Sequence, residues 1–230
     1  MNVWAERGVA LVLALMVILL LSALGLALVV TTSTEGLIAA NYRSGQEGLY
    51  AADAAAERAL NDLPGVADWN ALLDGSTPSA FVDGAPNGMR TLADGSTIDL
   101  TRILSTANCG KATPCSPADL VANLTGGRPW GANNPVWHFY AYGNLADLLP
   151  TAFVDSPFYV AVLVGDDPSE TDGDPLHDGV DPATNPGAGV LALRAEAFGP
   201  RGTHKVIELT VARADIPAAG VRVLSWRVVR

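Results

Sequence analysis

The N-terminal part of the chain lacks charge over a long stretch, and it also lacks proline. No charged residue occurs between Val9 and Thr34, and the first proline is Pro64. The run Val9–Val30 would form a helix of roughly 33 Å, enough to cross a hydrocarbon core of about 30 Å. A secretory signal peptide has an apolar region of only about 7–15 residues, followed by its cleavage site. The sequence therefore predicts a short leader (residues 1–8) and a transmembrane helix (residues 9–30).

The same helix is expected to continue beyond the membrane. Residues 31–63 are rich in alanine and other helix formers. Apolar residues recur there at spacings of three and four, which places one stripe on a helix: Leu49, Ala52, Ala56, Leu60 and Leu63. Pro64-Gly65 then supplies a stop signal. We expect an amphipathic continuation over residues 31–63 and a head over residues 64–230, which is long enough to bury one core.

The sequence also lacks the motifs of common catalytic chemistry. It contains no Gly-x-Ser-x-Gly elbow, phosphate-binding Gly-Lys-Ser/Thr loop, His-Glu-x-x-His or Gly-x-Gly-x-x-Gly fingerprint. The three histidines, His138, His177 and His204, are isolated from one another in the sequence. We therefore expect no enzymatic activity and assign no catalytic residue.

Positive charge is scarce in the head, which argues against nucleic-acid binding. Residues 64–230 contain 18 acidic and 11 basic residues, a net charge of −7, and such a head repels phosphate. The basic residues are scattered instead of forming a stripe. Arg222, Arg227 and Arg230 make a modest basic edge, which we expect to be solvated or paired with acids.

Cysteine occurs only twice, at Cys109 and Cys115. The two are six residues apart around a Gly-Lys-Ala-Thr-Pro segment, a spacing that a turn can close. A CxxC redox spacing is absent, and two cysteines without a nearby histidine do not make a structural zinc site. In an oxidising compartment we expect a disulfide, and free thiols are the alternative.

Beyond Pro64 the pattern is that of strands joined by long loops. Period-two alternation or β-branched and aromatic content predicts strands over Ser96–Leu104, Val136–Tyr142, Phe158–Val164, Gly189–Phe198, Thr203–Ala212 and Val221–Val229. Short helices are predicted over Val66–Leu73 and Pro117–Leu124. Runs of strands after a helix favour the α+β class, with the long helix packed on an antiparallel sheet.

One loop of the head, Gly165–Gly187, holds seven of its acids and no lysine or arginine. Concentrated carboxylates repel each other, and a hard cation such as calcium relieves that repulsion. The match to an EF-hand loop is poor, so two interpretations stay open: a calcium site or a solvated, flexible acidic loop. The candidate metal ligands are Asp166, Asp167, Asp172, Asp174 and Asp178.

The N-terminal sequence resembles a known family. It begins with Glu6-Arg7-Gly8 and an apolar run, and it continues with a Ser/Thr-rich exit, Asn41-Tyr42-Arg43 and an Ala-Ala-Asp-Ala-Ala helix. This order of motifs resembles type IV pilin-like proteins, and among them the PilX class of minor pilins. The resemblance is strongest over residues 6–60 and weaker in the head. It implies a pilin-like fold, cleavage by prepilin peptidase after Gly8, and Val9 as the mature N-terminus.

One departure from the family pattern bears on the role. Major pilins usually carry a glutamate at the fifth mature position, which here is Leu13. The resemblance therefore implies a minor subunit at a pilus tip or in assembly priming, not the repeating subunit. The implied partners are other minor and major pilins, prepilin peptidase and the inner membrane, with the head in the periplasm and, after assembly, at the cell surface. The alternatives are a minor pseudopilin of type II secretion and an uncleaved, membrane-anchored binding protein or adhesin.

Overall fold

The computed structural model describes residues 3–122, 128–148, 155–179, 183–214 and 220–229. The chain divides into two compact units, Met1–Arg43 and Ser44–Arg230, which are described separately. The long helix α1 (Val3–Asp62) supplies the described residues of the first unit and the beginning of the second. It begins inside the expected leader and ends one residue before the expected Leu63, where the 3-10 turn η1 (Leu63–Gly65) follows.

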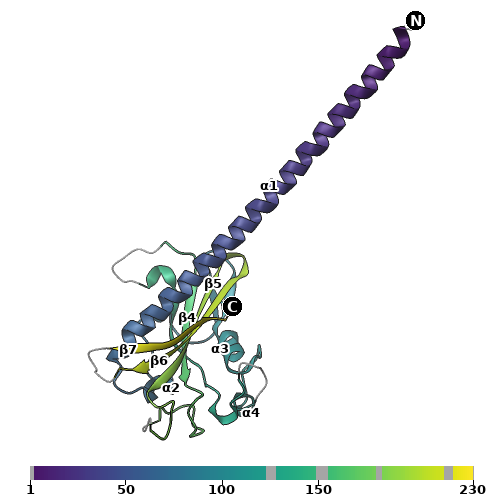
Figure 1. The fold of residues 1–230 in the computed structure, drawn as a ribbon. Coiled ribbons are helices and arrows are strands. Elements are labelled where there is room, and N and C mark those ends of the chain that lie inside the picture. The colour runs from purple at the N-terminus through teal and green to yellow at the C-terminus, as the bar shows by residue number, and fades with distance from the viewer. Residues whose placement is uncertain (1–2, 123–127, 149–154, 180–182, 215–219, 230) are drawn as a thin grey trace. The chain divides into compact units, whose positions relative to one another are not determined.

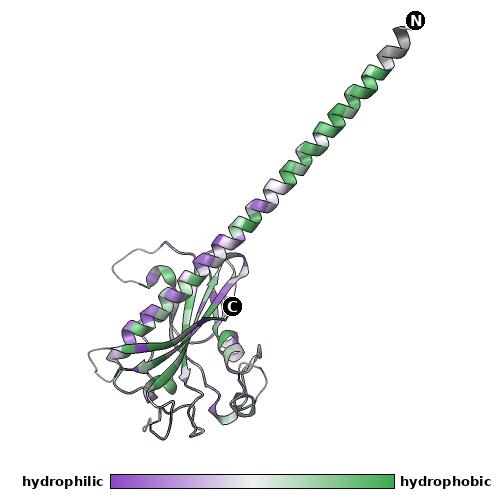
Figure 2. Ribbon diagram, viewed as in Figure 1, coloured by the Kyte–Doolittle hydropathy of each residue, from purple (hydrophilic) through white to green (hydrophobic). Residues whose placement is uncertain are grey.

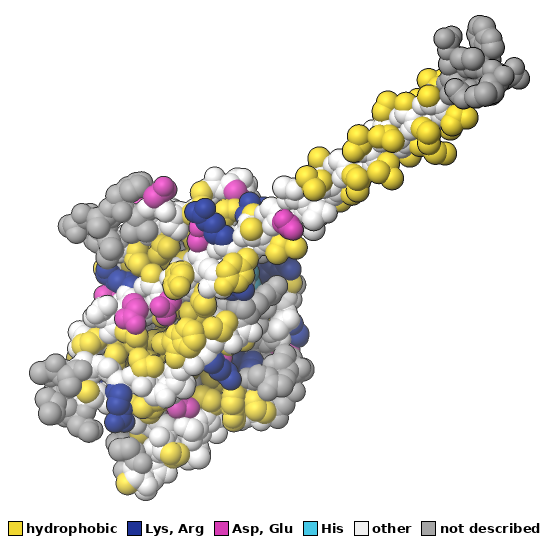
Figure 3. Space-filling view, turned by 45° about the horizontal axis from the view of Figure 1, so that its top comes forward, with side chains coloured by type: hydrophobic (Ala, Val, Ile, Leu, Met, Phe, Trp, Pro, Cys, Tyr) yellow, Lys and Arg dark blue, Asp and Glu magenta, His cyan; other side chains and the backbone are white. Residues whose placement is uncertain are grey.

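The first unit exposes its apolar side chains to the surroundings. Large hydrophobic residues from Val9 to Val30 are between 52% and 73% exposed. The ribbon of this part of α1 is coloured as hydrophobic in Figure 2, and Figure 3 shows apolar side chains along it. Among the described residues, one helix is long and apolar enough to cross a membrane, with a mean hydropathy of 3.0 in its most apolar window. Such a surface needs lipid or neighbouring helices to cover it.

The second unit is built on a five-stranded antiparallel sheet in the order β3-β4-β5-β6-β7 (Figure 1). Each strand pairs with the next one in sequence, which makes a simple meander. The strands are β3 (His138–Asn144), β4 (Tyr159–Asp166), β5 (Val190–Gly199), β6 (Thr203–Arg213) and β7 (Val221–Val228). This arrangement of a long helix followed by an antiparallel sheet confirms the α+β class.

Smaller elements connect and flank these strands. A two-stranded ribbon precedes α3, and short turns precede or follow the main strands. They are α2 (Asn70–Leu73), β1 (Met89–Thr91), β2 (Thr97–Asp99), α3 (Leu100–Cys109), α4 (Pro117–Leu120), η2 (Gly131–Asn133), η3 (Leu145–Asp147) and η4 (Pro200–Gly202). The predicted short helices therefore exist near their expected places, although residues 123–124 of the second lie outside the described residues.

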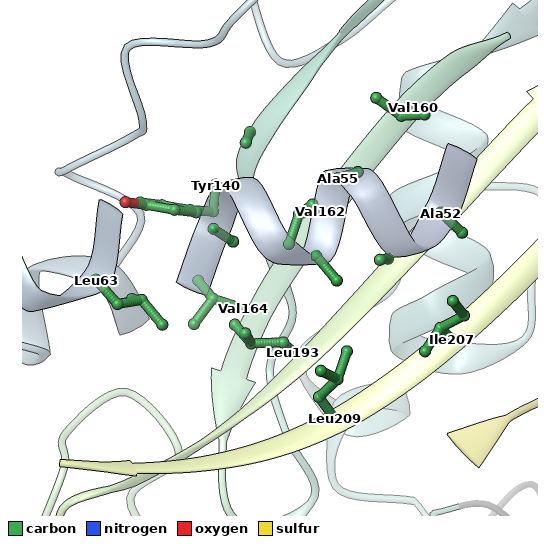
Figure 4. Packing of buried hydrophobic residues seen from close by; sticks show 14 of the residues in the cluster. Ala52, Ala55, Leu63, Tyr140, Val160, Val162, Val164, Leu193, Ile207 and Leu209 are labelled. Atoms are coloured by element: carbon green, nitrogen blue, oxygen red, sulfur yellow. The ribbon is translucent and has the colours of Figure 1, made fainter. Parts of the chain in front are cut away.

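The C-terminal part of α1 covers one face of the sheet. Five of its alanines are almost fully buried and allow the helix to approach the strands closely: Ala51, Ala52, Ala55, Ala56 and Ala59. Figure 4 shows Ala52 and Ala55 facing side chains of β4, β5 and β6, among them Val162, Leu193 and Ile207. The predicted apolar stripe thus lies in the contact between helix and sheet. Ala51, Ala55 and Ala59, which the predicted stripe did not include, are buried in the same contact.

On the opposite face of the sheet, α3 covers β3 and β4. The sequence predicted a strand over Ser96–Leu104 in this region, and that prediction was wrong. Only Thr97–Asp99 is a strand, and a helix begins at Leu100. The Asp99 side chain accepts a hydrogen bond from Thr101 N and caps the helix. Leu100, Ile103, Leu104 and Ala107 then form a helical face that packs on the second core cluster.

The predicted disulfide between Cys109 and Cys115 is confirmed. Cys109 is the last residue of α3, and Gly110 follows it in the left-handed conformation at φ 70° that ends a helix. The bond ties the loop after α3 back to the helix end. In the loop-entropy description, a ring this small contributes about 2 kcal/mol to stability.

Candidate functional site

Three carboxylates of the acidic loop come together at the end of β4. One ligand-type oxygen from each of Asp166, Glu170 and Asp178 lies within 4.8 Å of the others. Asp166 is 4% exposed and Glu170 is 2% exposed, so two negative groups are almost fully removed from water. Such an arrangement is costly unless the carboxylates are neutralised by protons, by hydrogen bonds or by a cation.

Hydrogen bonds from the loop hold Glu170 and Asp178 in place. Glu170 accepts from Gly179 N at 3.0 Å and from Asn185 Nδ2 at 2.9 Å. Asp178 accepts from Gly189 N at 2.6 Å. Because these donors come from both sides of residues 180–182, they draw the two ends of the loop onto Glu170 and Asp178.

A glycine is required beside this cluster. A Cβ atom on Gly187 would overlap the Glu170 side chain and would lie 2.8 Å from Glu170 N. Since Glu170 is nearly fully buried, its backbone and side chain have no room to withdraw. In the described part of the loop, Gly187 therefore packs closely against Glu170.

Burial raises the pKa of all three groups. Burial, and then the Glu170 charge, raise the pKa of Asp166 to about 8. Burial is also the main cause that raises the pKa of Glu170 and that of Asp178. At neutral pH the cluster therefore carries fewer negative charges than its three carboxyl groups would carry in water.

The structure brings together two of the five residues predicted as metal ligands, Asp166 and Asp178. Asp167 turns away to accept a hydrogen bond from Ser169 N, and Asp174 pairs with His177 at the exposed end of the loop. Asp172 lies outside the group of three, although its charge raises the pKa of Glu170. Asp181, another acid of the loop, lies outside the described residues.

Glu170 is the member of the cluster that the sequence analysis missed among its candidate ligands. It stands four residues after Asp166 in the sequence. Calcium takes six to eight oxygens, so the three carboxylates would need carbonyl or water oxygens as well. Several carboxylate oxygens already accept backbone or amide hydrogen bonds. Calcium binding stays a prediction, now placed at Asp166, Glu170 and Asp178.

The substitution Asp166→Asn tests the electrostatics of this cluster. The folded state binds more protons than the unfolded state between the ordinary pKa of 3.8 and the raised value of about 8. The contribution of Asp166 to stability is thus present below pH 3.8 and lost as the pH rises through 8. In calcium-free buffer at pH 8, we expect the variant to melt at least about 3 °C above the wild type, and the gain to vanish near pH 4.

Asp174→Asn is the matched control, because it removes the same charge from an exposed part of the loop. Thermal unfolding of the full chain in detergent should show no comparable pH-dependent gain for this control. A ligand that binds the folded state raises the melting temperature of the protein. Millimolar calcium should therefore raise the melting temperature of the wild type and of Asp174→Asn, but not that of Asp166→Asn, which lacks one of the proposed calcium ligands. If calcium changes the melting temperature of none of the three proteins, the prediction of a calcium site is wrong. Protonation of the carboxyl groups then relieves the repulsion within the cluster.

The N-terminal segment provides the second candidate site. Gly8 lies within α1, and no atom lies within 4 Å of a Cβ built on it; the same holds for Gly25 and Gly36. Neither packing nor a turn therefore explains the glycine at position 8. After the apolar run, the hydroxyls of Thr31, Thr32 and Thr34 donate to carbonyls one turn earlier at 2.9–3.0 Å, so these polar groups are satisfied inside the helix.

Residues 7–57 match the family model described as PilX N-terminal. The N-terminal segment of this chain is therefore similar to the N-terminal segment of PilX-type proteins. The match begins at Arg7, directly before Gly8, and ends within the part of α1 that packs on the sheet. No curated protein and no solved structure matches the chain.

The PilX N-terminal segment thus includes the Gly8-Val9 junction, the apolar run and much of the alanine stripe. The sheet and the acidic cluster lie beyond it. In the described part of the chain, the α+β architecture is pilin-like, because the strands follow the helix and pack on its alanines.

Proposed function

We propose that the chain is a minor pilin-like subunit of a type IV pilus that acts in assembly priming or at the pilus tip. The observation that carries this proposal is the PilX N-terminal match over residues 7–57, which includes Gly8 and Val9. Prepilin peptidase cuts the chain between these two residues. The peptidase, the inner membrane and other minor and major pilins are its partners, and the role is structural and not enzymatic.

The exposed apolar surface of α1 supports a proposal that this helix moves from the lipid bilayer to contacts with neighbouring subunits. Before assembly the run Val9–Val30 lies in the inner membrane, and the head lies in the periplasm. Arg7 precedes the run and Glu35 follows it, which is consistent with an N-terminus inside the cell. During assembly the same surface packs on neighbouring helices, where close packing replaces contact with lipid tails.

Leu13 supports a minor position in the filament. In the pilin-like family a glutamate at the fifth mature position neutralises the N-terminal amine of a neighbouring subunit. A chain with Leu13 supplies no such charge, and an amine without a counter-charge in an apolar setting is unfavourable. This subunit is therefore suited to a unique place in the complex and not to the repeating lattice.

The substitution Leu13→Glu tests this role, with Leu15→Glu as the matched control. Both leucines are exposed on the same helix, at 57% and 59%. Filaments sheared from cells expressing the wild type should contain a few copies of the chain for each filament. Leu13→Glu should raise that number, and Leu15→Glu should not, since its carboxylate lies at the wrong position.

The outcomes also separate the alternatives. Recovery with secretion components instead of sheared pili would assign the chain to type II secretion as a minor pseudopilin. A chain found only in the membrane, at full length, would contradict the proposal and favour an anchored binding protein or adhesin.

A further inference from the structure

The strand β7 leaves one edge of the sheet without a partner strand. In the described part of the chain it pairs with β6 alone, and it is the last strand in the sheet order (Figure 1). All of its residues except Val221 are exposed. A free edge of eight residues presents backbone N–H and C=O groups that can pair with a further strand.

One face of β7 is apolar and uncovered. In an antiparallel sheet, residues opposite each other point to the same side. Trp226 lies opposite Leu209, and Val228 lies opposite Ile207, and both partners belong to the core under α1. Trp226 and Val228 are nevertheless 46% and 47% exposed. The apolar face of the sheet thus continues onto β7 beyond the area that α1 covers.

The other face of β7 borders a groove of about 710 Å³. Its floor is the polar face of β5, β6 and β7, and its walls include α3 and the segment around Trp130. Five charged residues line it, Arg128, Arg194, Arg227, Asp167 and Glu208, with a net charge of +1 in a head whose net charge is −7. Glu208 accepts from Arg194 at 2.7 Å and from Arg227 Nε at 3.0 Å.

Arg128 is a buried cation without a carboxylate partner among the described residues. It is 7% exposed, and it donates to two backbone carbonyls, Pro135 O at 2.7 Å and Leu120 O at 3.1 Å. Its Nε is buried without a hydrogen-bond partner. Residues 123–127, Asn-Leu-Thr-Gly-Gly, contain no acid that could pair with it. A buried guanidinium that lacks a counter-charge is unfavourable, so an anion arriving in the groove would gain from it.

We propose that β7 is the docking edge for an extended segment of a different protein, a segment whose residues alternate between apolar and acidic. The incoming backbone pairs with β7, as in other cases of strand addition. Its apolar side chains lie beside Trp226 and Val228, and its carboxylates face the groove that contains Arg128 and Arg227. The proposal rests on the head alone and is independent of the role proposed for the N-terminal segment.

A second copy of this chain is the less suitable occupant of the edge. Antiparallel pairing over the whole of Val221–Val228 would place Arg222 of each copy opposite Arg227 of the other. Like charges directly opposite each other destabilise a strand pair. The head therefore favours a partner that brings acidic residues to this edge.

The test uses the full chain in detergent micelles and three labelled probes. The first is an eight-residue peptide alternating valine and glutamate, acetylated and amidated, and the second replaces every glutamate by glutamine. The third is the glutamate peptide with alternate backbone amides methylated, which blocks strand pairing. By fluorescence anisotropy we expect the glutamate peptide to bind at least about tenfold more tightly than the glutamine peptide, and the methylated peptide not to bind.

Two further measurements locate the site. Hydrogen exchange should show that the glutamate peptide protects the amides of residues 221–228. Arg128→Gln should reduce the preference for glutamate over glutamine to about one, whereas Arg102→Gln should retain it, since Arg102 is exposed on α3 and does not line the groove. If Arg128→Gln does not fold, the affinities of the three peptides for the wild type still test both strand pairing and the preference for acidic side chains.

Three results would overturn the proposal. They are equal affinity for the glutamate and glutamine peptides, binding that survives backbone methylation, and no binding of any probe. In the last case the arginines of β7 protect the edge against pairing instead of recruiting a partner. The amides of residues 221–228 could also become protected as the protein concentration rises. That result would show self-association through β7, assign the edge to a second copy of the chain and contradict the proposal.

Discussion

Gly8→Val is expected to abolish processing of the chain by prepilin peptidase while leaving the fold intact. The PilX N-terminal match includes this residue, and in the pilin-like family the peptidase cuts after the glycine. A Cβ at position 8 meets no atom within 4 Å, so the substitution cannot act through packing within the chain. We expect the variant to accumulate in the membrane at full length and to be absent from sheared filaments.

Gly25→Val is the control for this experiment. It introduces the same side chain at a second glycine of α1 that also has nothing within 4 Å. Gel mobility after co-expression with the peptidase should show that this control is processed like the wild type. Processing of Gly8→Val, or failure to process both variants, would contradict the assignment of the cleavage site.

Leu193→Ala is expected to destabilise the head by about 2–5 kcal/mol, because it leaves a cavity in a packed core. Leu193 is 0% exposed on β5, and it lies under the alanines of α1 (Figure 4). For a domain of this size, the loss corresponds to a melting temperature lower by roughly 5–15 °C. Near-ultraviolet circular dichroism of the full chain in detergent follows the tertiary packing of the head.

Leu224→Ala removes the same atoms from an exposed position on β7, where Leu224 is 48% exposed. Its cost should stay within about 0.5 kcal/mol in the isolated protein. Equal destabilisation by the two variants would show that the helix and sheet do not form the core described above.

The fold could be predicted from the sequence wherever a pattern is both long and local. The apolar run, the alanine spacing and the strong strands such as Phe158–Val164 each identify an element without reference to the rest of the chain. The neighbouring strands predicted over Gly189–Phe198 and Thr203–Ala212 form a hairpin, and Arg201 adopts φ 57° at its tip. Ser96–Leu104 failed because its alternation ends at Asp99. The cap at Asp99, the apolar spacing after it and Gly110 were the signals for a helix.

The acidic site could be predicted only as a region. Which carboxylates meet depends on contacts between residues far apart in the loop, such as Gly179 and Asn185 with Glu170. The partner of His204 could not be predicted for a similar reason. Its side chain is half-buried and bonds to Glu196, which lies across the hairpin on β5. Pairing of this kind follows from strand register, which the pattern of one strand does not define.

The N-terminus of the wild-type chain after co-expression with a prepilin peptidase tests the central claim most directly. Intact mass and N-terminal sequencing should give a chain that starts at Val9. A chain that still starts at Met1, with the peptidase shown to be active on another substrate, would contradict the account and leave a permanent membrane anchor.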